Sequence, residues 1–119
     1  MTLPLTPAVL EAAYAYLRAT SPFKSWKLPH ADEVEFCVTQ HRDQEGDHYV
    51  YQRTTDHVIR ISATTITTTP ALMIVMAHEM IHEKQEIAKT ARRGGHNKEW
   101  HRLAKRVCAT HGWDVRLFI

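Results

Sequence analysis

Residues 69–100 read TPALMIVMAHEMIHEKQEIAKTARRGGHNKEW, and this stretch decides the fold. The Thr69-Pro70 pair is a helix start, because threonine caps the first turn and proline lacks only an N–H that would have no partner there. A long helix is therefore expected from Pro70 to about Arg92. Gly94-Gly95 then stops the helix and lets the chain reverse. A second helix is expected to return along the first, from Asn97 to about Thr110.

The chain before this stretch has the pattern of one helix followed by three strands. Thr6-Pro7 repeats the helix-start signal, and apolar residues then recur at helical spacing: Leu10, Ala13, Tyr14 and Leu17. Alternating apolar and polar residues predict three strands, over residues 34–38, 49–52 and 58–61. Trp113 to Ile119 is expected as a last strand. This order predicts an α+β domain in which helices pack against a small antiparallel three-stranded sheet.

Composition limits the class of protein. The chain has 119 residues, of which 44% are hydrophobic and 24% charged, so one globular domain over residues 1–119 is expected and disorder is excluded. The longest uncharged apolar run, residues 71–77, is far below the roughly 20 residues that cross a bilayer, so no membrane partner is expected. The N-terminus does not have the pattern of a secretory signal. Two cysteines, Cys37 and Cys108, make no disulfide framework, and a reducing, cytoplasmic location is expected.

His78-Glu79-Met80-Ile81-His82 is an H-E-x-x-H motif inside the expected long helix. At about 100° per residue, His82 lies about 40° around the helix axis from His78 and one turn further along. Both imidazoles therefore project to one side, where they can share a metal ion. Glu79 lies beside this pair, where it can accept a proton from a metal-activated water without binding the metal. The alternative to metal binding is that both are core histidines whose nitrogen atoms form hydrogen bonds within the protein.

A catalytic zinc ion needs a third protein ligand. His96 follows the Gly94-Gly95 break, and a histidine at the start of the returning helix is well placed to face the first two. Glu99 and His101 are the alternatives; His101 lies about 140° around the helix from His96, so these two are not expected to face one metal together. His111 is at the far end of that helix. The remaining histidines are expected to be surface or hydrogen-bonded residues: His30, His41, His48 and His57.

The segment from His78 to Trp100 resembles the SprT/Spartan-like zinc metalloprotease family, whose members carry H-E-x-x-H and a downstream glycine-histidine segment with an aromatic residue. In this sequence the second segment is Gly95-His96-Asn97-Lys98-Glu99-Trp100. The resemblance implies a zincin-like fold, one Zn²⁺ per chain held by His78, His82 and His96, and Glu79 as catalytic acid/base. Asn97 stands where the family usually has glycine. The chain is expected to be a minimal catalytic domain without the zinc ribbon of many members.

The expected function is that of a zinc-dependent endopeptidase. Zinc held by three imidazoles lowers the pKa of its bound water towards about 7. Glu79 is expected to accept that proton as the water attacks a peptide carbonyl, and then to pass it to the leaving amine. Because extended substrates commonly pair with an exposed strand edge, the strand at residues 58–61 is expected to offer that edge.

Charge along the chain leaves a second class of function open. Residues 83–119 hold nine Lys/Arg and four Asp/Glu, a net charge of +5, whereas residues 1–82 have a net charge of −3. A basic segment of this kind can contact DNA, or it can be the solvated face of a helix. The protease is therefore expected to act on protein or peptide substrates, among them DNA-associated proteins. One alternative is a zinc-stabilised nucleic-acid- or protein-binding module without proteolytic activity. A third hypothesis is a zinc hydrolase that acts on a non-peptide or cell-wall substrate.

Overall fold

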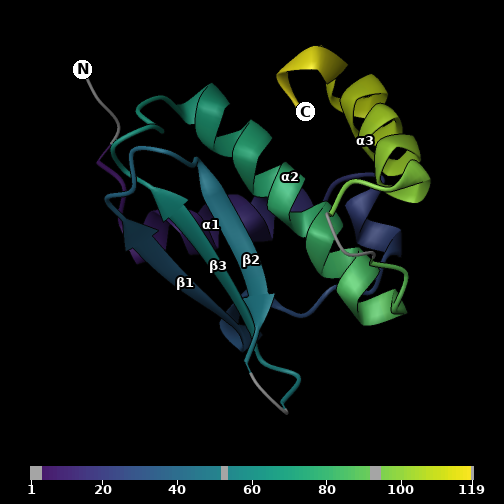
Figure 1. The fold of residues 1–119 in the computed structure, drawn as a ribbon, viewed down its shortest axis with the longest axis horizontal. Helices are drawn as coiled ribbons and strands as arrows, with labels where there is room; N and C mark the ends of the chain where they lie inside the picture. Colours follow the sequence, from purple (N-terminus) through teal and green to yellow (C-terminus); the bar gives the residue numbers. More distant parts are fainter. Residues whose placement is uncertain (1–3, 52–53, 92–94, 119) are drawn as a thin grey trace.

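A computed structural model describes residues 4–51, 54–91 and 95–118 of the chain (Figure 1). The helices are α1 (Pro7–Arg18), α2 (Thr69–Ala88) and α3 (Lys98–His111), and the strands are β1 (Val34–Thr39), β2 (Gly46–Val50) and β3 (His57–Ser62). Short 3₁₀ turns lie at Phe23–Ser25, Ala31–Glu33 and Val115–Leu117. This is the α+β class that the sequence predicts. Within the described residues, no helix has both the length and the apolarity needed to cross a bilayer.

The three strands form one mixed sheet in the order β1-β3-β2. β2 and β3 are antiparallel, but β1 and β3 are parallel, so the expectation of a wholly antiparallel sheet is wrong. The reason is that β3 takes the centre, where both of its edges are paired and five of its six residues are buried. The chain from β1 to β2 crosses the end of β3, where the Ser62 N–H donates to the Glu45 carbonyl at 2.8 Å.

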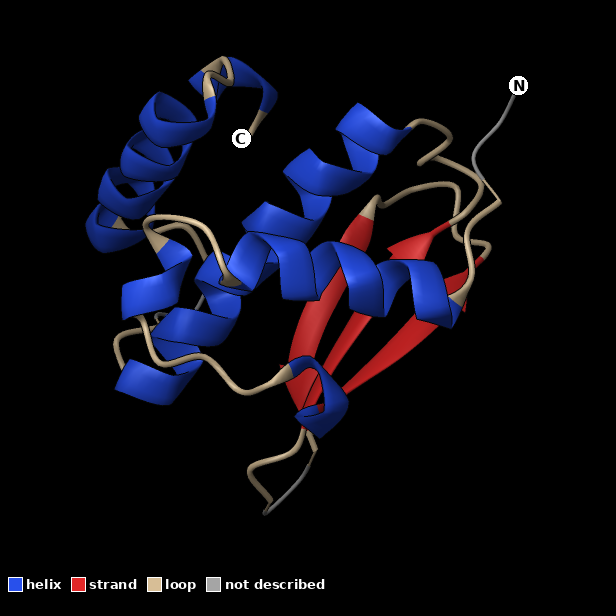
Figure 2. Ribbon diagram, turned by 180° about the vertical axis from the view of Figure 1, so that it is seen from behind, coloured by secondary structure: helices blue, strands red, loops and turns tan. Residues whose placement is uncertain are grey.

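The helices bury the apolar residues of the sheet (Figure 2). α1 crosses the sheet face that is turned to the viewer in Figure 2 and packs against β1, whereas α2 packs against β2, β3 and α1. α3 packs on α2, on the side away from the sheet. Many of the largest fully buried side chains come from the three helices and from β3, and they include Leu10, Tyr14, Ile59, Ile61, Met76, Met80, Ile81 and Trp100. Since α2 contacts both the sheet and the other two helices, side chains on α2 lie at the centre of the molecule.

The observed ends of α2 differ slightly from the expected ones. Its N-cap is Thr68, whose hydroxyl accepts from the Ala71 N–H at 3.2 Å, so Thr69-Pro70 lies in the first turn. The helix ends at Ala88 because Lys89 takes left-handed backbone with a φ of 58°. Arg92 and Gly94, where the sequence predicted the end and the stop, lie outside the described residues. Both ends of α3 lie one residue later in the sequence than expected.

The segment after α3 is a 3₁₀ turn rather than the expected last strand, so that expectation is wrong. The Asp114 carboxylate accepts from the Arg116 N–H at 2.9 Å and caps the turn Val115–Leu117. Phe118 is 2% exposed, and its ring centroid lies 6.0 Å from that of Trp100. A capped turn and a buried aromatic side chain fix this segment against α2 and α3, which leaves it unable to add to the sheet.

Candidate metal centre

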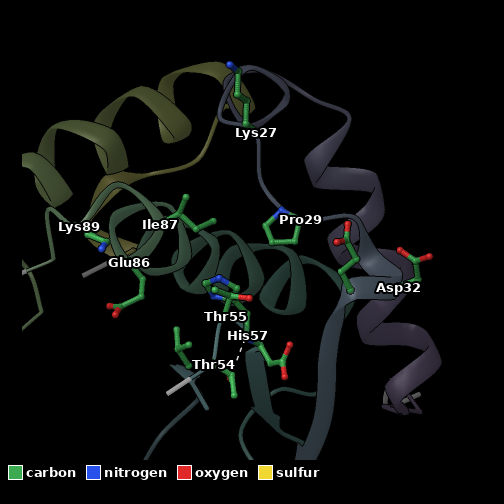
Figure 3. A pocket seen from close by; sticks show the side chains of 12 residues that line it. Lys27, Pro29, Asp32, Thr54, Thr55, His57, Glu86, Ile87 and Lys89 are labelled. Carbon is green, nitrogen blue, oxygen red and sulfur yellow. Dashed lines mark hydrogen bonds between the residues drawn. The ribbon is translucent and has the colours of Figure 1, made fainter. Parts of the chain in front are cut away.

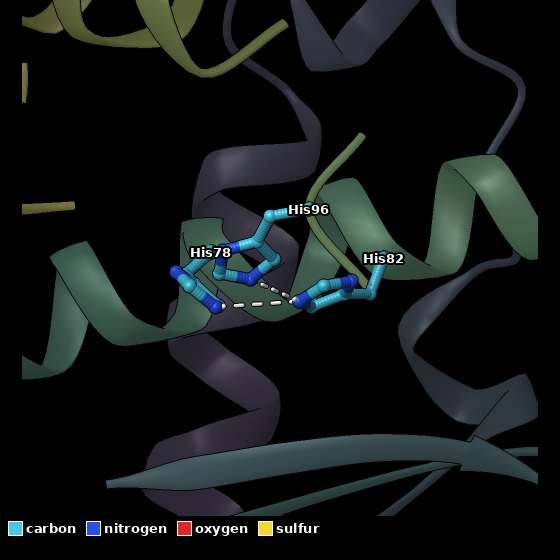
Figure 4. A group of neighbouring side chains, drawn as sticks. All are labelled: His78, His82 and His96. Atoms are coloured by element: carbon cyan, nitrogen blue, oxygen red, sulfur yellow. Dashed lines mark hydrogen bonds between the residues drawn. The ribbon is translucent and has the colours of Figure 1, made fainter. Parts of the chain in front are cut away.

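The side chains of His78 and His82 meet on one side of α2, as the helical spacing predicts. Their Nε2 atoms lie 3.3 Å apart. His96, in the connection between α2 and α3, places its own Nε2 atom 3.2 Å from that of His82 (Figure 4). The three candidate ligand nitrogens all lie within 4.8 Å of one another. The structure thus brings together the three histidines that the sequence singled out.

Gly95 and Trp100 position His96, although the His96 side chain is exposed. Gly95 has a φ of 88°, a left-handed conformation that L side chains rarely adopt, and a Cβ there would lie 3.6 Å from Cε1 of His82. The imidazole of His96 stacks on the indole of Trp100, with ring centroids 3.8 Å apart and an interplanar angle of 7°. The backbone therefore passes close to His82, and the indole fixes the plane of the third imidazole.

The Phe118 carbonyl orients His78. This carbonyl lies 2.8 Å from Nδ1 of His78, so Nδ1 donates the hydrogen bond and the Nε2 lone pair faces the other two histidines. Burial lowers the pKa of His78 to about 4 and that of His82 to about 3, and it also lowers the pKa of His96. Neutral imidazoles with free lone pairs are the form that binds metal. The donor set therefore fits a divalent metal ion.

Glu79 lies next to this group without joining it. Its side chain is buried, and its Oε2 atom is 4.0 Å from Nε2 of His78. Burial raises the pKa of Glu79 to about 8, and the charges of Asp47 and Glu45 add to this rise. A carboxyl group held in a water-poor position beside a metal-binding group has the placement of a general acid/base.

Two hollows flank the histidines, and both are lined by Gly46, His78 and Glu79. The larger, of about 510 Å³, also reaches Leu117 and Phe118, and the smaller, of about 320 Å³, reaches His48 and His82. Both border the start of β2, which is an edge strand next to α2. The expectation that residues 58–61 offer the substrate edge is wrong, because β3 is paired on both sides.

The alternative third ligands lie outside the group. Oε1 of Glu99 accepts from Nε2 of Gln85 at 2.9 Å and from the hydroxyl of Thr90. The ring centroid of His101 lies 6.2 Å from that of His96, edge-on to it. His111 contacts the Ser21 carbonyl at 3.0 Å, at the far end of α3. Neither Glu99 nor His101 belongs to a group of described side chains that can share one metal.

Asn97 replaces the glycine of the family pattern and has a structural role. Its side-chain oxygen accepts from the Trp100 N–H at 2.9 Å, which caps α3, and from Nε2 of Gln85 at 2.9 Å. Its side-chain nitrogen donates to the Thr90 carbonyl at 2.9 Å. Asn97 therefore ties the start of α3 to the end of α2, next to His96.

Sequence reasoning missed a second group, formed by His48, His57 and Glu83, whose candidate ligand atoms also lie within 4.8 Å of one another. The two histidines were expected to be surface or hydrogen-bonded residues, and they do contact each other. His48 pairs with Ile59 and His57 with Val50 across the β2–β3 ladder, so the histidines are diagonal neighbours on one face of the sheet. The two histidines meet through the register of β2 on β3, which no spacing in the sequence specifies.

An H-E-x-x-H helix with a third histidine from the following segment defines a metallopeptidase-like class of domain. The profile of the SprT-like family matches residues 14–117, nearly the whole chain, and the protein belongs to this family. The family resemblance drawn from residues 78–100 is thus confirmed. Comparison with curated proteins gives no match.

Proposed function

We propose that this protein is a zinc-dependent endopeptidase. His78, His82 and His96 are the ligands of one Zn²⁺, and Glu79 is the catalytic acid/base. The observation that carries the proposal is the convergence of three Nε2 atoms, with a buried carboxyl group 4.0 Å from one of them, between two hollows. A group of this kind has the parts that peptide hydrolysis needs: a metal ligand set, a proton carrier and access for a substrate.

Each residue of the candidate site has a definite role in this proposal. Zinc, when bound, supplies Lewis acidity that polarises a carbonyl and activates water. Glu79 takes a proton from the attacking water and returns it to the leaving nitrogen, so that one carboxyl group serves as base and then as acid. The Phe118 carbonyl holds His78 in the tautomer with a free Nε2, and Trp100 holds the plane of His96. Burial of Glu79 keeps bulk water from competing for its proton.

The substrate lies along β2 in this proposal. Among the described strands, β2 pairs only with β3, and Gly46 at its start lines both hollows. An extended peptide can bond to such an edge through its main chain. It would then run past Glu79 and the three histidines. The substrate class is therefore an extended polypeptide segment rather than a folded surface.

The basic C-terminal third supports DNA-associated proteins as the substrates. Lys98, Arg102 and Lys105 recur at helical spacing on α3 and are exposed, and Arg106 lies beside them. This same surface favours the alternative, a zinc-stabilised nucleic-acid-binding module. The two differ in whether peptide bonds are cleaved, and binding through such a surface would weaken steeply with salt in both cases.

The experiment is to measure zinc content and proteolysis in the same preparations. Wild-type protein and Glu79→Gln are analysed for bound metal and assayed for casein cleavage and autolysis, with and without single-stranded DNA and with a chelator. We expect Glu79→Gln to keep the zinc of the wild type and to lose cleavage. Full activity in Glu79→Gln overturns the role of Glu79, and salt-sensitive DNA binding by a zinc-loaded wild type without cleavage favours the binding module.

A further inference from the structure

A second group of candidate metal ligands lies next to the first, on an adjoining face of α2. It joins three elements: His48 on β2, His57 at the start of β3, and Glu83 on α2. Nε2 of His48 lies 2.8 Å from Nδ1 of His57, and that Nδ1 lies 3.9 Å from Oε2 of Glu83. The two imidazoles stack, with ring centroids 5.1 Å apart. No residue is shared with the first group, since Glu83 follows His82 and points about 100° away around the helix.

The Glu83 carboxylate is the observation that demands a ligand. The residue is completely buried, and its Oε1 atom accepts from the hydroxyl of Tyr14 at 2.8 Å. Its Oε2 atom has no hydrogen-bond partner among the described residues and is directed at His57. A buried carboxylate oxygen without a partner is costly, so native structures rarely keep one without a cation, a donor or a water next to it.

The proton between the two imidazoles does not satisfy this group. The two imidazole nitrogens that face each other share a single proton, because one must donate and the other accept. That hydrogen bond supplies nothing to Oε2 of Glu83. One cation bound by both nitrogens and by this oxygen would satisfy all three atoms at once.

The donor set and its charge state fit a transition metal. Two imidazole nitrogens and one carboxylate oxygen are typical ligands of Zn²⁺ and related first-row divalent ions. Burial lowers the pKa of His48 to about 4 and also lowers that of His57, so both rings are neutral near pH 7. Neutral rings need to lose no proton before they bind a metal.

The group borders open space on two sides. His48 lines the 320 Å³ hollow next to the first group of histidines. His57 lines another hollow, of about 890 Å³, which lies between the start of β3 and the end of α2 and is not lined by His78, His82 or His96 (Figure 3). An ion can therefore approach the three side chains although Glu83 itself is buried.

We propose that His48, His57 and Glu83 form a second metal site, which binds a divalent transition-metal ion, zinc foremost. The ion ties β2 and β3 to α2. Because β2 is the edge strand next to the three-histidine centre, the second ion holds the proposed substrate edge at a fixed distance from that centre. The site does not depend on proteolytic activity.

The test is the number of zinc ions per chain. The full chain is stripped of metal with a chelator, loaded with Zn²⁺, passed through a desalting column and analysed by mass spectrometry for zinc. We expect two ions in the wild type, one in Glu83→Gln and one in His96→Ala. His41→Ala, which removes an exposed imidazole that belongs to neither group, is the matched control and should keep two.

The variants separate the two sites from each other. A single ion in the wild type that is lost in His96→Ala and kept in Glu83→Gln overturns the second site. A single ion lost in Glu83→Gln and kept in His96→Ala supports the second site and contradicts the three-histidine centre. Two ions in Glu83→Gln also overturn the proposal.

Folding of the variants is checked by circular dichroism. If Glu83→Gln fails to fold, His48→Asn replaces it, because His48 is only partly buried and β2 is an edge strand. A folded His48→Asn is expected to hold one zinc ion. Two ions in that variant overturn the proposal. Cobalt loading adds a spectroscopic check, since the visible absorption of a site with two nitrogens and one oxygen differs from that of a three-histidine site.

Discussion

The imidazole of His96 lies flat on the indole of Trp100, with ring centroids 3.8 Å apart and planes 7° from parallel. The histidine is exposed and the tryptophan is completely buried, so the stack ties an exposed side chain to the buried face of α3. Ring centroids of His78 and His82 also lie 4.8 Å and 5.6 Å from the same indole. One aromatic ring thus backs all three histidines of the proposed zinc centre.

Replacing Trp100 should therefore weaken zinc binding as well as stability. Trp100→Ala is expected to cost about 3–5 kcal/mol in the free energy of unfolding, because it removes a large buried side chain. Trp100→Phe keeps an aromatic ring and loses no hydrogen bond, since the indole N–H has no partner among the described residues. Zinc titration of the folded Phe variant should give an affinity closer to wild type than that of the Ala variant.

Trp113→Ala is the matched control for Trp100. Trp113 is half-buried and stacks on His111, whose ring centroid is 4.7 Å away, rather than on a proposed ligand. Zinc affinity in this variant should stay at the wild-type level. Equal losses of affinity in the Trp100 and Trp113 variants would mean that stability, and not the stack on His96, sets the affinity.

Gly95→Ala tests the left-handed backbone before His96. At a φ of 88°, an L side chain is strained by about 1–2 kcal/mol, and relief of that strain would shift His96. Zinc affinity should fall roughly tenfold, which is about 1.4 kcal/mol. Gly112→Ala is the control, since Gly112 has a φ of 76° with nothing within 4 Å of the added Cβ. It should lower stability similarly and leave zinc affinity unchanged in a calorimetric titration.

Glu99→Gln tests both the ligand set and a pH effect. Hydrogen bonds from Thr90 and Gln85 lower the pKa of Glu99 below its usual 4.5. Because the pKa is lower in the folded state, this stabilisation is complete above about pH 5 and is lost as the pH falls through the lowered pKa. Urea unfolding of metal-free protein should therefore show a steeper loss of stability on acidification in the wild type than in Glu99→Gln.

The same variant should bind zinc as the wild type does. Glu99 is not one of the grouped side chains, and its Oε1 atom is already occupied by two donors. Loss of zinc in a folded Glu99→Gln protein would identify Glu99 as the third ligand in place of His96. Parallel acid-unfolding curves for the two proteins would contradict the pKa argument separately.

Removal of metal should lower the thermal stability of the wild type. A ligand that binds only the folded state adds about 2.7 kcal/mol when its free concentration is 100 times its dissociation constant. Differential scanning calorimetry with and without a chelator measures this change. His96→Ala should show a smaller shift, and an unchanged wild-type melting temperature would argue against any bound metal.

Local periodicity made much of α2 predictable. A helix places His78 and His82 on one side through its own geometry, and the Gly94-Gly95 break before His96 indicated a reversal of the chain. The same local rules gave the start of α1 and both ends of α3 within about one residue. The sheet was less predictable because alternation of apolar residues gives strands but not their order, and β3 lies between β1 and β2.

Contacts between distant segments decided the details of both groups of candidate ligands. The Phe118 carbonyl, which orients His78, comes from a segment that the sequence predicted as a strand. His48 and His57 meet Glu83 only because the register of β2 on β3 and the packing of α2 against both bring them together. No spacing in the sequence carries that information.

The sequence by itself determined the α+β class, the helix that carries H-E-x-x-H, and the candidate ligands His78, His82 and His96, because helix geometry and glycine breaks act over a few residues. Tertiary structure decided that β2 is the edge beside the centre, that Trp100 and Phe118 orient the imidazoles, and that His48, His57 and Glu83 converge. The physical reason is that strand order and side-chain convergence depend on how the whole core packs, which no local pattern specifies.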